Sequence, residues 1–218
     1  MTLDPEELVR SYPNVYHMAE LGSWPSIQNR GLLSTTALLD LFEIEGTERS
    51  RLESQWRPRS VTINHRVHGS AVIRDQGPMP DNELKELLVG MDPREWYELI
   101  NGKTFFWADK YGLAKLLGAV RYRNKSHDVL TVDTRLLLAR YMQRITLTDQ
   151  NSGSIINKKL RGRDTFRKVS EFNHRYVTEV AVDYSVPDVA DLTVRVEEWM
   201  GARNIRQIWS RDTRGAGA

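Results

Sequence analysis

The chain has 218 residues, of which 40% are hydrophobic and 28% are charged, and it contains no cysteine. This composition is typical of a folded globular protein, and the length suffices for one sizeable core. The absence of cysteine excludes disulfides, a thiol nucleophile and cysteine-ligated zinc, and it predicts a cytoplasmic protein. No apolar run approaches the ~20 residues of a membrane span, and the acidic N-terminus lacks the features of a signal peptide.

The net charge of +2 gives no general signal for nucleic-acid binding, although 23 of the 31 basic residues are arginines. Arginine binds phosphates through paired hydrogen bonds and stacks on flat rings. The arginine excess therefore has two interpretations, which are phosphate binding and a codon bias. No two of the five histidines have the helical H-x-x-x-H spacing of a zinc site, so we expect no metal.

The first half of the chain is predicted to be mainly helical. A helix is expected over residues 1–12, with Thr2 or Asp4 as its cap and Pro5 in its first turn. A strand follows at residues 15–18. The next helix ends at a glycine. In chain order, the predictions are helices at residues 24–30, 36–45 and 48–56, a strand or ordered loop at 61–73, and helices at 82–88 and 93–101.

The second half is predicted to alternate between strands and helices. Strands are expected at residues 104–107, 128–133, 145–147, 176–184 and 192–196, and helices at residues 110–122 and 135–141. These elements indicate an α+β fold. We predict an N-terminal helix over 1–14, a single domain over 15–200 and a C-terminal tail over 201–218 that is frayed from Gly215.

The first candidate site residue is His17, which lies in a short apolar strand just before the helix at 24–30. We expect the start of that helix to suit an anion, because its first N–H groups have no partner within the helix. A histidine in this position either meets a ligand or lies partly buried and bonded to the backbone.

The strand at 104–107 carries three consecutive aromatic residues, Phe105, Phe106 and Trp107. They cannot share one face, because successive side chains of a strand point to opposite sides. One face can therefore offer a flat surface to a ring such as nicotinamide, or the strand is buried on both faces.

A single glutamate, Glu179, lies within a valine-rich strand. This is unusual, because an ionised carboxylate is costly to bury without a partner. On the wall of a cleft, the carboxylate can hold a ribose hydroxyl and stabilise positive charge on a sugar carbon. On an edge strand, it is simply exposed to solvent.

Arginines before and after the apolar segment at 71–73 are candidates for binding a pyrophosphate. Arg74 directly follows that segment, which can fix its position. The spacing does not choose between Arg74 and the cluster that precedes it, which consists of Arg49, Arg51, Arg57 and Arg59.

Together these segments resemble an ADP-ribosyltransferase, and most nearly the DarT toxins, which attach ADP-ribose to bases of single-stranded DNA. DarT-like chains open with a Tyr-His strand, a helix with isoleucine and a Gly-Leu-Leu segment, as Tyr16–His17, Ile27 and Gly31–Leu33 do here. They also carry a glutamate in a late strand that runs into Val-Pro, as Glu179 and Val186–Pro187 do. The resemblance spans residues 15–196 in short islands, and RNA 2′-phosphotransferases share its opening motif.

The resemblance implies an ADP-ribosyltransferase-like split β-sheet with flanking helices, and mono-ADP-ribosyl transfer from NAD to a nucleic acid, DNA or RNA. It implies a toxin or phage-defence protein with an antitoxin partner and no metal. The implied catalytic residues are Glu179 and Arg74, and the implied NAD-binding residues are His17, Ser26, Gly31, Leu32, Phe106, Trp107 and Arg51.

Two alternatives keep the fold but change the function. One is an NAD-dependent RNA 2′-phosphotransferase, which needs several basic residues and no essential glutamate. The other is a module of the same fold that binds a nucleotide or a protein and catalyses nothing. The resemblance supplies no counterpart for the segment 151–163.

Overall fold

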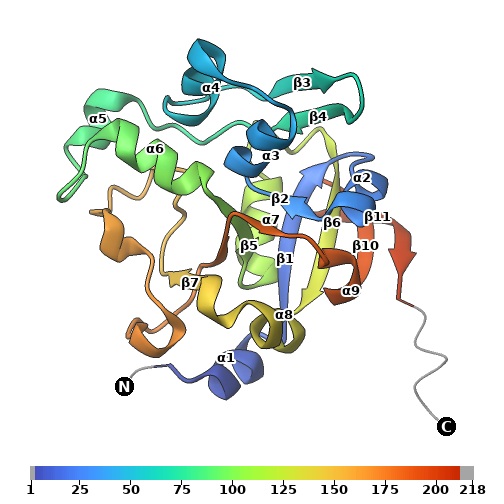
Figure 1. Ribbon diagram of the computed structural model, residues 1–218. Coiled ribbons are helices and arrows are strands. Elements are labelled where there is room, and N and C mark those ends of the chain that lie inside the picture. Colours follow the sequence, from blue (N-terminus) through green and yellow to red (C-terminus); the bar gives the residue numbers. More distant parts are fainter. Residues whose placement is uncertain (1–2, 212–218) are drawn as a thin grey trace, which may run out of the picture.

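The strands form one large antiparallel sheet through the middle of the molecule (Figure 1). In the computed structural model, which describes residues 3–211, the order of its seven strands is β11-β10-β6-β1-β5-β8-β7. These strands are β1 (Asn14–Glu20), β5 (Lys103–Trp107), β6 (Ser126–Asp133), β7 (Ile145–Thr148), β8 (Glu179–Asp183), β10 (Thr193–Met200) and β11 (Arg203–Ser210). Two small sheets pair β2 (Leu32–Leu33) with β9 (Ser185–Val186), and β3 (Val61–His65) with β4 (Gly69–Ile73).

Short helices surround the sheet. Figure 1 shows α1 and α8 at one end of the molecule and α3, α4 and the β3–β4 hairpin at the other. Among residues 3–211, no helix has the length and apolar character needed to cross a membrane. The helices are α1 (Pro5–Ser11), α2 (Trp24–Arg30), α3 (Thr35–Leu41), α4 (Gly46–Glu53), α5 (Asp81–Lys85), α6 (Pro93–Asn101), α7 (Lys110–Leu117), α8 (Thr134–Tyr141) and α9 (Val189–Leu192).

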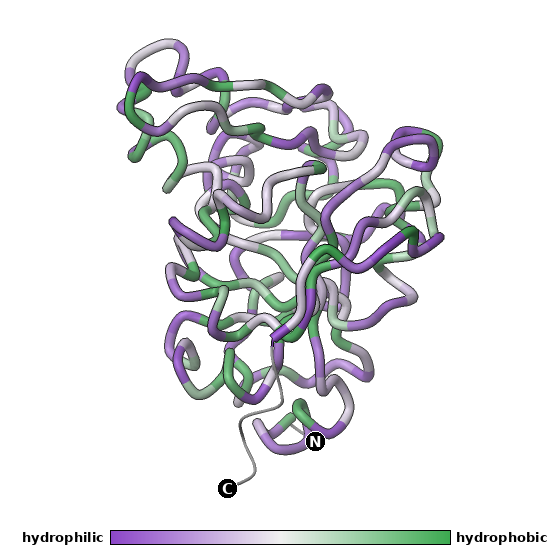
Figure 2. The backbone as a smooth tube through the Cα atoms, turned by 90° about the vertical axis from the view of Figure 1, so that its right-hand side faces the viewer, coloured by the Kyte–Doolittle hydropathy of each residue, from purple (hydrophilic) through white to green (hydrophobic). Residues whose placement is uncertain are grey.

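Hydrophobic side chains pack on both faces of the large sheet. Leu130 and Val180 of the central strands belong to the main core, which α1, α8 and α9 cover. On the opposite face, Leu113 of α7 packs with Tyr16 and Met18 of β1. Separate clusters lie under α5 and α6 and between α3, α4 and the hairpin. Figure 2 shows hydrophobic stretches through the middle of the molecule and hydrophilic stretches at many outer turns. The chain is thus a single-domain α+β fold.

The two central strands β1 and β5 separate almost as soon as they meet. Tyr16 opposite Trp107 is the one register pair between them in the described residues, whereas β1 pairs with β6 along all of Asn14–Glu20. On its far side, β5 pairs with β8 from Lys103 to Trp107. The sheet therefore opens between β1 and β5, and the backbone on either side of this opening is held in place by other strands.

Local capping explains why two helices have the predicted bounds. Asp92 and Glu95 form a capping box at the start of α6, and Pro93 takes the first position, where its missing N–H costs nothing. Helix α2 ends at Gly31, whose φ of 83° lies in the region that favours glycine. At the N-terminal helix, Asp4 is the cap.

Several predicted elements differ from the structure. The predicted tail over 201–218 contains β11, which pairs along β10 and packs Ile208 and Trp209 against the main core. The segment 61–73 is a hairpin of two strands. The helix predicted to reach residue 122 ends at Leu117, where Gly118 follows and the chain turns. Residues 1–2 and 212–218, with Thr2 and the frayed end from Gly215, lie outside the described residues.

Gly31 allows us to predict a large loss of stability. A Cβ added there would lie 2.3 Å from the Pro187 Cα, and the φ of 83° is unfavourable for other residues. We expect Gly31→Ala to lower the free energy of unfolding by about 3 kcal/mol or more, measured by urea denaturation. Gly22 is the matched control, because its φ is 81° and a Cβ there meets nothing within 4 Å. Gly22→Ala should cost only about 1 kcal/mol, and equal losses for the two variants would contradict the account.

Candidate functional site

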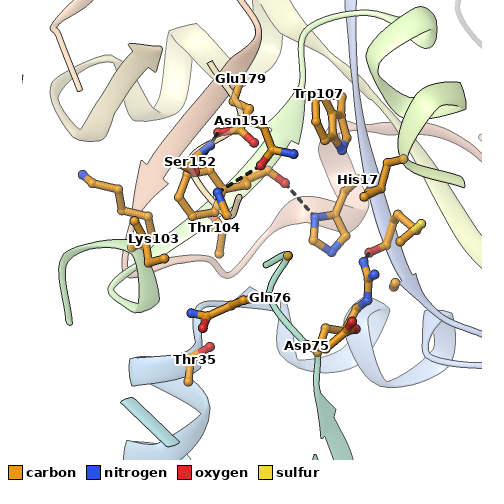
Figure 3. A pocket seen from close by; sticks show the side chains of 18 of the residues that line it. His17, Thr35, Asp75, Gln76, Lys103, Thr104, Trp107, Asn151, Ser152 and Glu179 are labelled. Atoms are coloured by element: carbon orange, nitrogen blue, oxygen red, sulfur yellow. Dashed lines mark hydrogen bonds between the residues drawn. The ribbon is translucent and has the colours of Figure 1, made fainter. Parts of the chain in front are cut away.

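A cavity of about 1250 Å³ lies where the sheet opens. It exceeds the ~300–1,000 Å³ of ordinary small-molecule sites. Its walls come from β1, α2, β4 and the segment after it, β5, α7 and the loop before β8. In Figure 3, Glu179, Asn151 and Ser152 lie together at one side of the pocket, and Thr35, Asp75 and Gln76 lie at the opposite side.

His17 bridges the opening between β1 and β5. Its Nδ1–H donates to the Phe105 carbonyl at 2.8 Å, and its ring packs edge-on against Phe106. The carbonyl can only accept, so Nδ1 carries the proton and Nε2 of the neutral ring is an acceptor. Burial, together with the nearby positive charge of Arg74, lowers the pKa of His17 to about 4. At neutral pH, His17 is therefore a fixed, uncharged group on the cavity wall (Figure 3).

Glu179 is the buried carboxylate of the site, with 5% of its surface exposed. It opens β8 and lies between Trp107 of β5 and Thr148 of β7. Its Oε2 accepts hydrogen bonds from Ser152, from the backbone N–H at 3.1 Å and from Oγ–H at 2.7 Å. Burial raises the pKa of Glu179 to about 7, and these bonds and the charge of Arg161 oppose the rise. The carboxyl group can thus exchange a proton near neutral pH, as a general acid or base must.

His17 and Glu179 line the same cavity although they come from opposite faces of the sheet. Tyr16, Trp107 and Glu179 are successive register partners across three strands, so their side chains share one face. His17 follows Tyr16 and points to the other face. Both line the same cavity because β1 and β5 are apart here. The opening thus brings together groups that a continuous sheet would keep separate.

Two arginines give the cavity a positive wall. Arg74 donates from Nη1 to the Met18 carbonyl at 3.0 Å, and its guanidinium lies 5.0 Å from the centre of the Tyr122 ring. Arg57 is 6% exposed and bonds only neutral acceptors, among them the Arg74 carbonyl and the Asn101 Oδ1. Within residues 3–211 neither arginine forms an ion pair, unlike Arg121, which pairs with Asp75 at 2.6 Å. Burial lowers the pKa of Arg57 to about 10, which leaves it charged at neutral pH.

The other predicted residues divide into two groups. Ser26, Gly31, Leu32 and Trp107 line the cavity together with His17, Arg74 and Glu179. Phe106 does not line it, because it is fully buried in the main core on the face opposite Trp107. Arg51 does not line it either. It lies exposed on α4. Of the predicted site, the structure therefore brings seven residues together and leaves two outside.

The expectation that the start of α2 suits a bound anion is wrong. The Trp24 N–H donates to the Asp128 Oδ2 at 2.9 Å, and Asp128 is fully buried in β6. A carboxylate of the chain itself thus occupies the positive end of this helix. The signal for this was not local, because Asp128 is 104 residues away in the sequence.

Two residues of the site, Ser152 and Arg161, are not predicted from the sequence, and both lie in the segment without a counterpart in the resemblance. Arg57 is one of the arginines that the sequence offers as pyrophosphate candidates, but nothing in the sequence singles it out. No periodicity or motif marks them, since each acts through contacts with distant parts of the chain. The burial of an arginine depends on tertiary packing, so it can be recognised in the structure but not in the sequence.

The raised pKa of Glu179 predicts a pH dependence of stability. Between its ordinary value of 4.5 and about 7, folded Glu179 holds a proton that the unfolded chain releases, so the contribution of Glu179 to stability falls as pH rises through this window. The fall is on the order of 3 kcal/mol. Glu179→Gln removes the titrating group, so its unfolding free energy should lack this fall. Urea denaturation at about pH 5 and about pH 8 measures the difference, and parallel pH profiles for variant and wild type would contradict it.

A comparison of the chain with curated proteins gives no match. Residues 13–193 match the family that is described as "Family of unknown function (DUF7002)". The matched range starts just before β1 and ends at the first residue of β10, so it covers most of the chain and all the cavity residues named above. The chain therefore belongs to the DUF7002 family.

Proposed function

We propose that the protein is a mono-ADP-ribosyltransferase that uses NAD as donor and a nucleic acid as acceptor, on an ADP-ribosyltransferase-like fold. The observation that carries the proposal is the convergence of His17, Arg74 and Glu179 on one cavity at the opening of the sheet. The same three residues are those that the resemblance to DarT toxins singles out. The proposal includes a toxin or phage-defence role, which the resemblance to DarT toxins implies. It also includes a cytoplasmic location, because NAD and nucleic acids are both found in the cytoplasm.

The residues of the cavity fit NAD in size and charge. A volume of about 1250 Å³ leaves room for a dinucleotide and part of a second substrate. Arg57 and Arg74 form no ion pair within the described residues, although the carboxylate of Asp75 acts on Arg57 at longer range, and their positive charge suits a pyrophosphate. The neutral His17 presents Nε2 as an acceptor for a ribose hydroxyl. Trp107 adds a half-buried flat ring for stacking.

NAD supplies a ribose carbon from which nicotinamide leaves with the bonding electrons, and an acceptor atom takes its place and loses a proton. Glu179 binds the ribose beside this carbon, and its negative charge stabilises the positive charge that develops there. Its pKa of about 7 allows it to take the acceptor's proton. Arg74 and Arg57 balance the charge of the phosphates, and Trp107 keeps water from the leaving group.

Exposed aromatic residues at the rim support a nucleic-acid acceptor. Tyr111 and Tyr176 line the cavity near Trp107 and Glu179 in the sequence, and they are 72% and 61% exposed. A cation lies over each ring, Lys115 over Tyr111 at 5.5 Å and Arg175 over Tyr176 at 5.1 Å. Stacking on aromatic rings combined with positive charge is how proteins hold single-stranded nucleic acid.

The test uses labelled NAD with single-stranded DNA, RNA or 2′-phosphorylated RNA. We expect label transfer to a nucleic acid by the wild type, and a loss of about a thousandfold or more in Glu179→Gln, because the transition-state charge loses its partner. Glu83→Gln, at an exposed position of α5 away from the cavity, is the matched control and should retain the rate.

Three outcomes would count against the proposal. Transfer that persists in Glu179→Gln would overturn the role of Glu179. Removal of the 2′-phosphate would favour the phosphotransferase alternative. If NAD does not shift the melting temperature, the binding-module alternative is favoured.

Arg74 and Arg51 give a prediction about donor binding. Arg74→Gln should weaken NAD binding about tenfold or more, since a charge-assisted hydrogen bond to phosphate is lost. Arg51→Gln should leave the Kd unchanged, because Arg51 lies exposed on α4 and does not line the cavity. Isothermal titration calorimetry measures both. Equal effects of the two substitutions would contradict the assignment of the pyrophosphate to Arg74.

A further inference from the structure

The loop between β7 and β8 covers Glu179. We call residues 149–162 the 149–162 loop. Ser152 of this loop is 2% exposed and gives both of its donors, N–H and Oγ–H, to the same carboxylate oxygen of Glu179. Both bonds favour the ionised carboxylate, because an ionised group accepts more strongly than a protonated one. The other carboxylate oxygen, Oε1, receives no hydrogen bond from the described residues, so Ser152 fixes one oxygen and leaves the other for a substrate.

Contacts on two sides hold Ser152 in place. On one side, the Gly77 N–H donates to the Gly153 carbonyl at 2.7 Å, and the Ile155 N–H donates to the Pro78 carbonyl at 3.1 Å. Gly77 has no room for a side chain, since a Cβ would lie 2.7 Å from the Ser154 Cβ. On the other side, Arg161 Nη1 donates to the Ser152 carbonyl at 3.4 Å. The loop is therefore fastened across the cavity at the point where it meets Glu179.

Arg161 is buried in a way that its packing alone does not explain. It is 2% exposed, and its guanidinium lies 5.4 Å from the centre of the Trp96 ring. Its Nη2 has no hydrogen-bond partner among the described residues, which is an unfavourable state for a buried donor. Its positive charge acts on Glu179. Arg161 keeps its positive charge in the interior although one of its donors has no hydrogen bond. This indicates that its charge has a role at the Glu179 carboxylate.

We propose that Ser152 is a positioning residue that fixes the Glu179 carboxylate and favours its ionised form, and that Arg161 supports it from behind. The proposal assigns neither of them a contact with the substrates. Both act through Glu179, Ser152 by direct hydrogen bonds and Arg161 by holding the Ser152 carbonyl and by its charge. The inference rests on the function proposed above, because it gives Glu179 a reacting role.

Few other groups lie close enough to Glu179 to change its protonation. The strands on either side place Trp107 and Thr148 beside it, and neither carries a charge. Among the described residues, Arg161 is the charged group that acts on it. Burial favours the protonated form, and Ser152 and Arg161 favour the ionised form. Removing either should therefore leave Glu179 more often protonated at neutral pH.

The experiment titrates the Glu179 carboxyl carbon by NMR in protein labelled with ¹³C at glutamate side-chain carboxyls, with the signal assigned by its absence in Glu179→Gln. We expect a midpoint near 7 in the wild type and a midpoint about one unit higher in Ser152→Ala, because one of two hydrogen bonds to the carboxylate is lost. Ser154→Ala is the matched control. Its hydroxyl lies on the same loop and accepts from the Ile156 N–H at 3.4 Å, so the midpoint should not move.

Arg161→Gln provides the second variant, since it removes the charge and leaves both Ser152 donors. We expect its midpoint to rise as well, and circular dichroism reports whether each variant is folded. When transfer is measured across pH, the rise in rate on the acidic side of the profile should occur at a higher pH in Ser152→Ala than in the wild type. The KM for NAD should be unchanged. An unchanged midpoint in folded Ser152→Ala, or the same rise in Ser154→Ala, would overturn the inference.

The titration needs no NAD, so it separates two failures. If the midpoint moves as expected but no ADP-ribose is transferred, the proposed function is wrong and the control of Glu179 by Ser152 stands. If transfer depends on Glu179 but the midpoint in Ser152→Ala stays near 7, the function stands and the positioning role falls.

Discussion

The separation of β1 from β5 is the constraint on which the site depends. Two central strands of an antiparallel sheet would ordinarily share a full set of hydrogen bonds. Here the Tyr16–Trp107 pair is followed by a gap, and the imidazole of His17 takes up the Phe105 carbonyl that the ladder leaves free. This single bond satisfies a backbone acceptor, fixes the tautomer of the histidine and sets one edge of the cavity. The other strands on each side keep the gap from closing.

The electrostatic state of the cavity follows from its depth. A low local dielectric disfavours charge on both His17 and Glu179, so His17 is neutral and Glu179 is only partly ionised at neutral pH, while the arginines remain charged. The walls thus combine two arginines that form no ion pair within the described residues and an acid whose pKa lies near neutral pH. If the same side chains were exposed to water, their charges would be screened, and their pKa values would lie close to those of ordinary surface residues. The fold gives them their properties by excluding water.

Local features of the sequence predicted local structure well. The bounds of α2 and α6 follow from a glycine, a proline and a capping aspartate within a few residues of the helix ends. Seven of the predicted site residues line the cavity, and each of them lies in one of the short sequence motifs described above. What could not be predicted depends on long-range contacts. Phe106 and Trp107 are neighbours in sequence, yet only the register of β5 decides which of them faces the cavity.

The carboxylate of Asp128 at the start of α2 affects how this protein can recognise phosphate. Many proteins hold phosphates with backbone N–H groups at a helix start, and substitutions scarcely alter such a cradle because it contains no side chain. Here the Trp24 N–H is already bonded to a carboxylate of the chain, so a phosphate in the cavity would depend more on side chains such as the guanidinium of Arg74. Recognition by side chains can be retuned or abolished by single substitutions. Phosphate recognition by such side chains is therefore open to rapid evolutionary change in a way that backbone recognition is not.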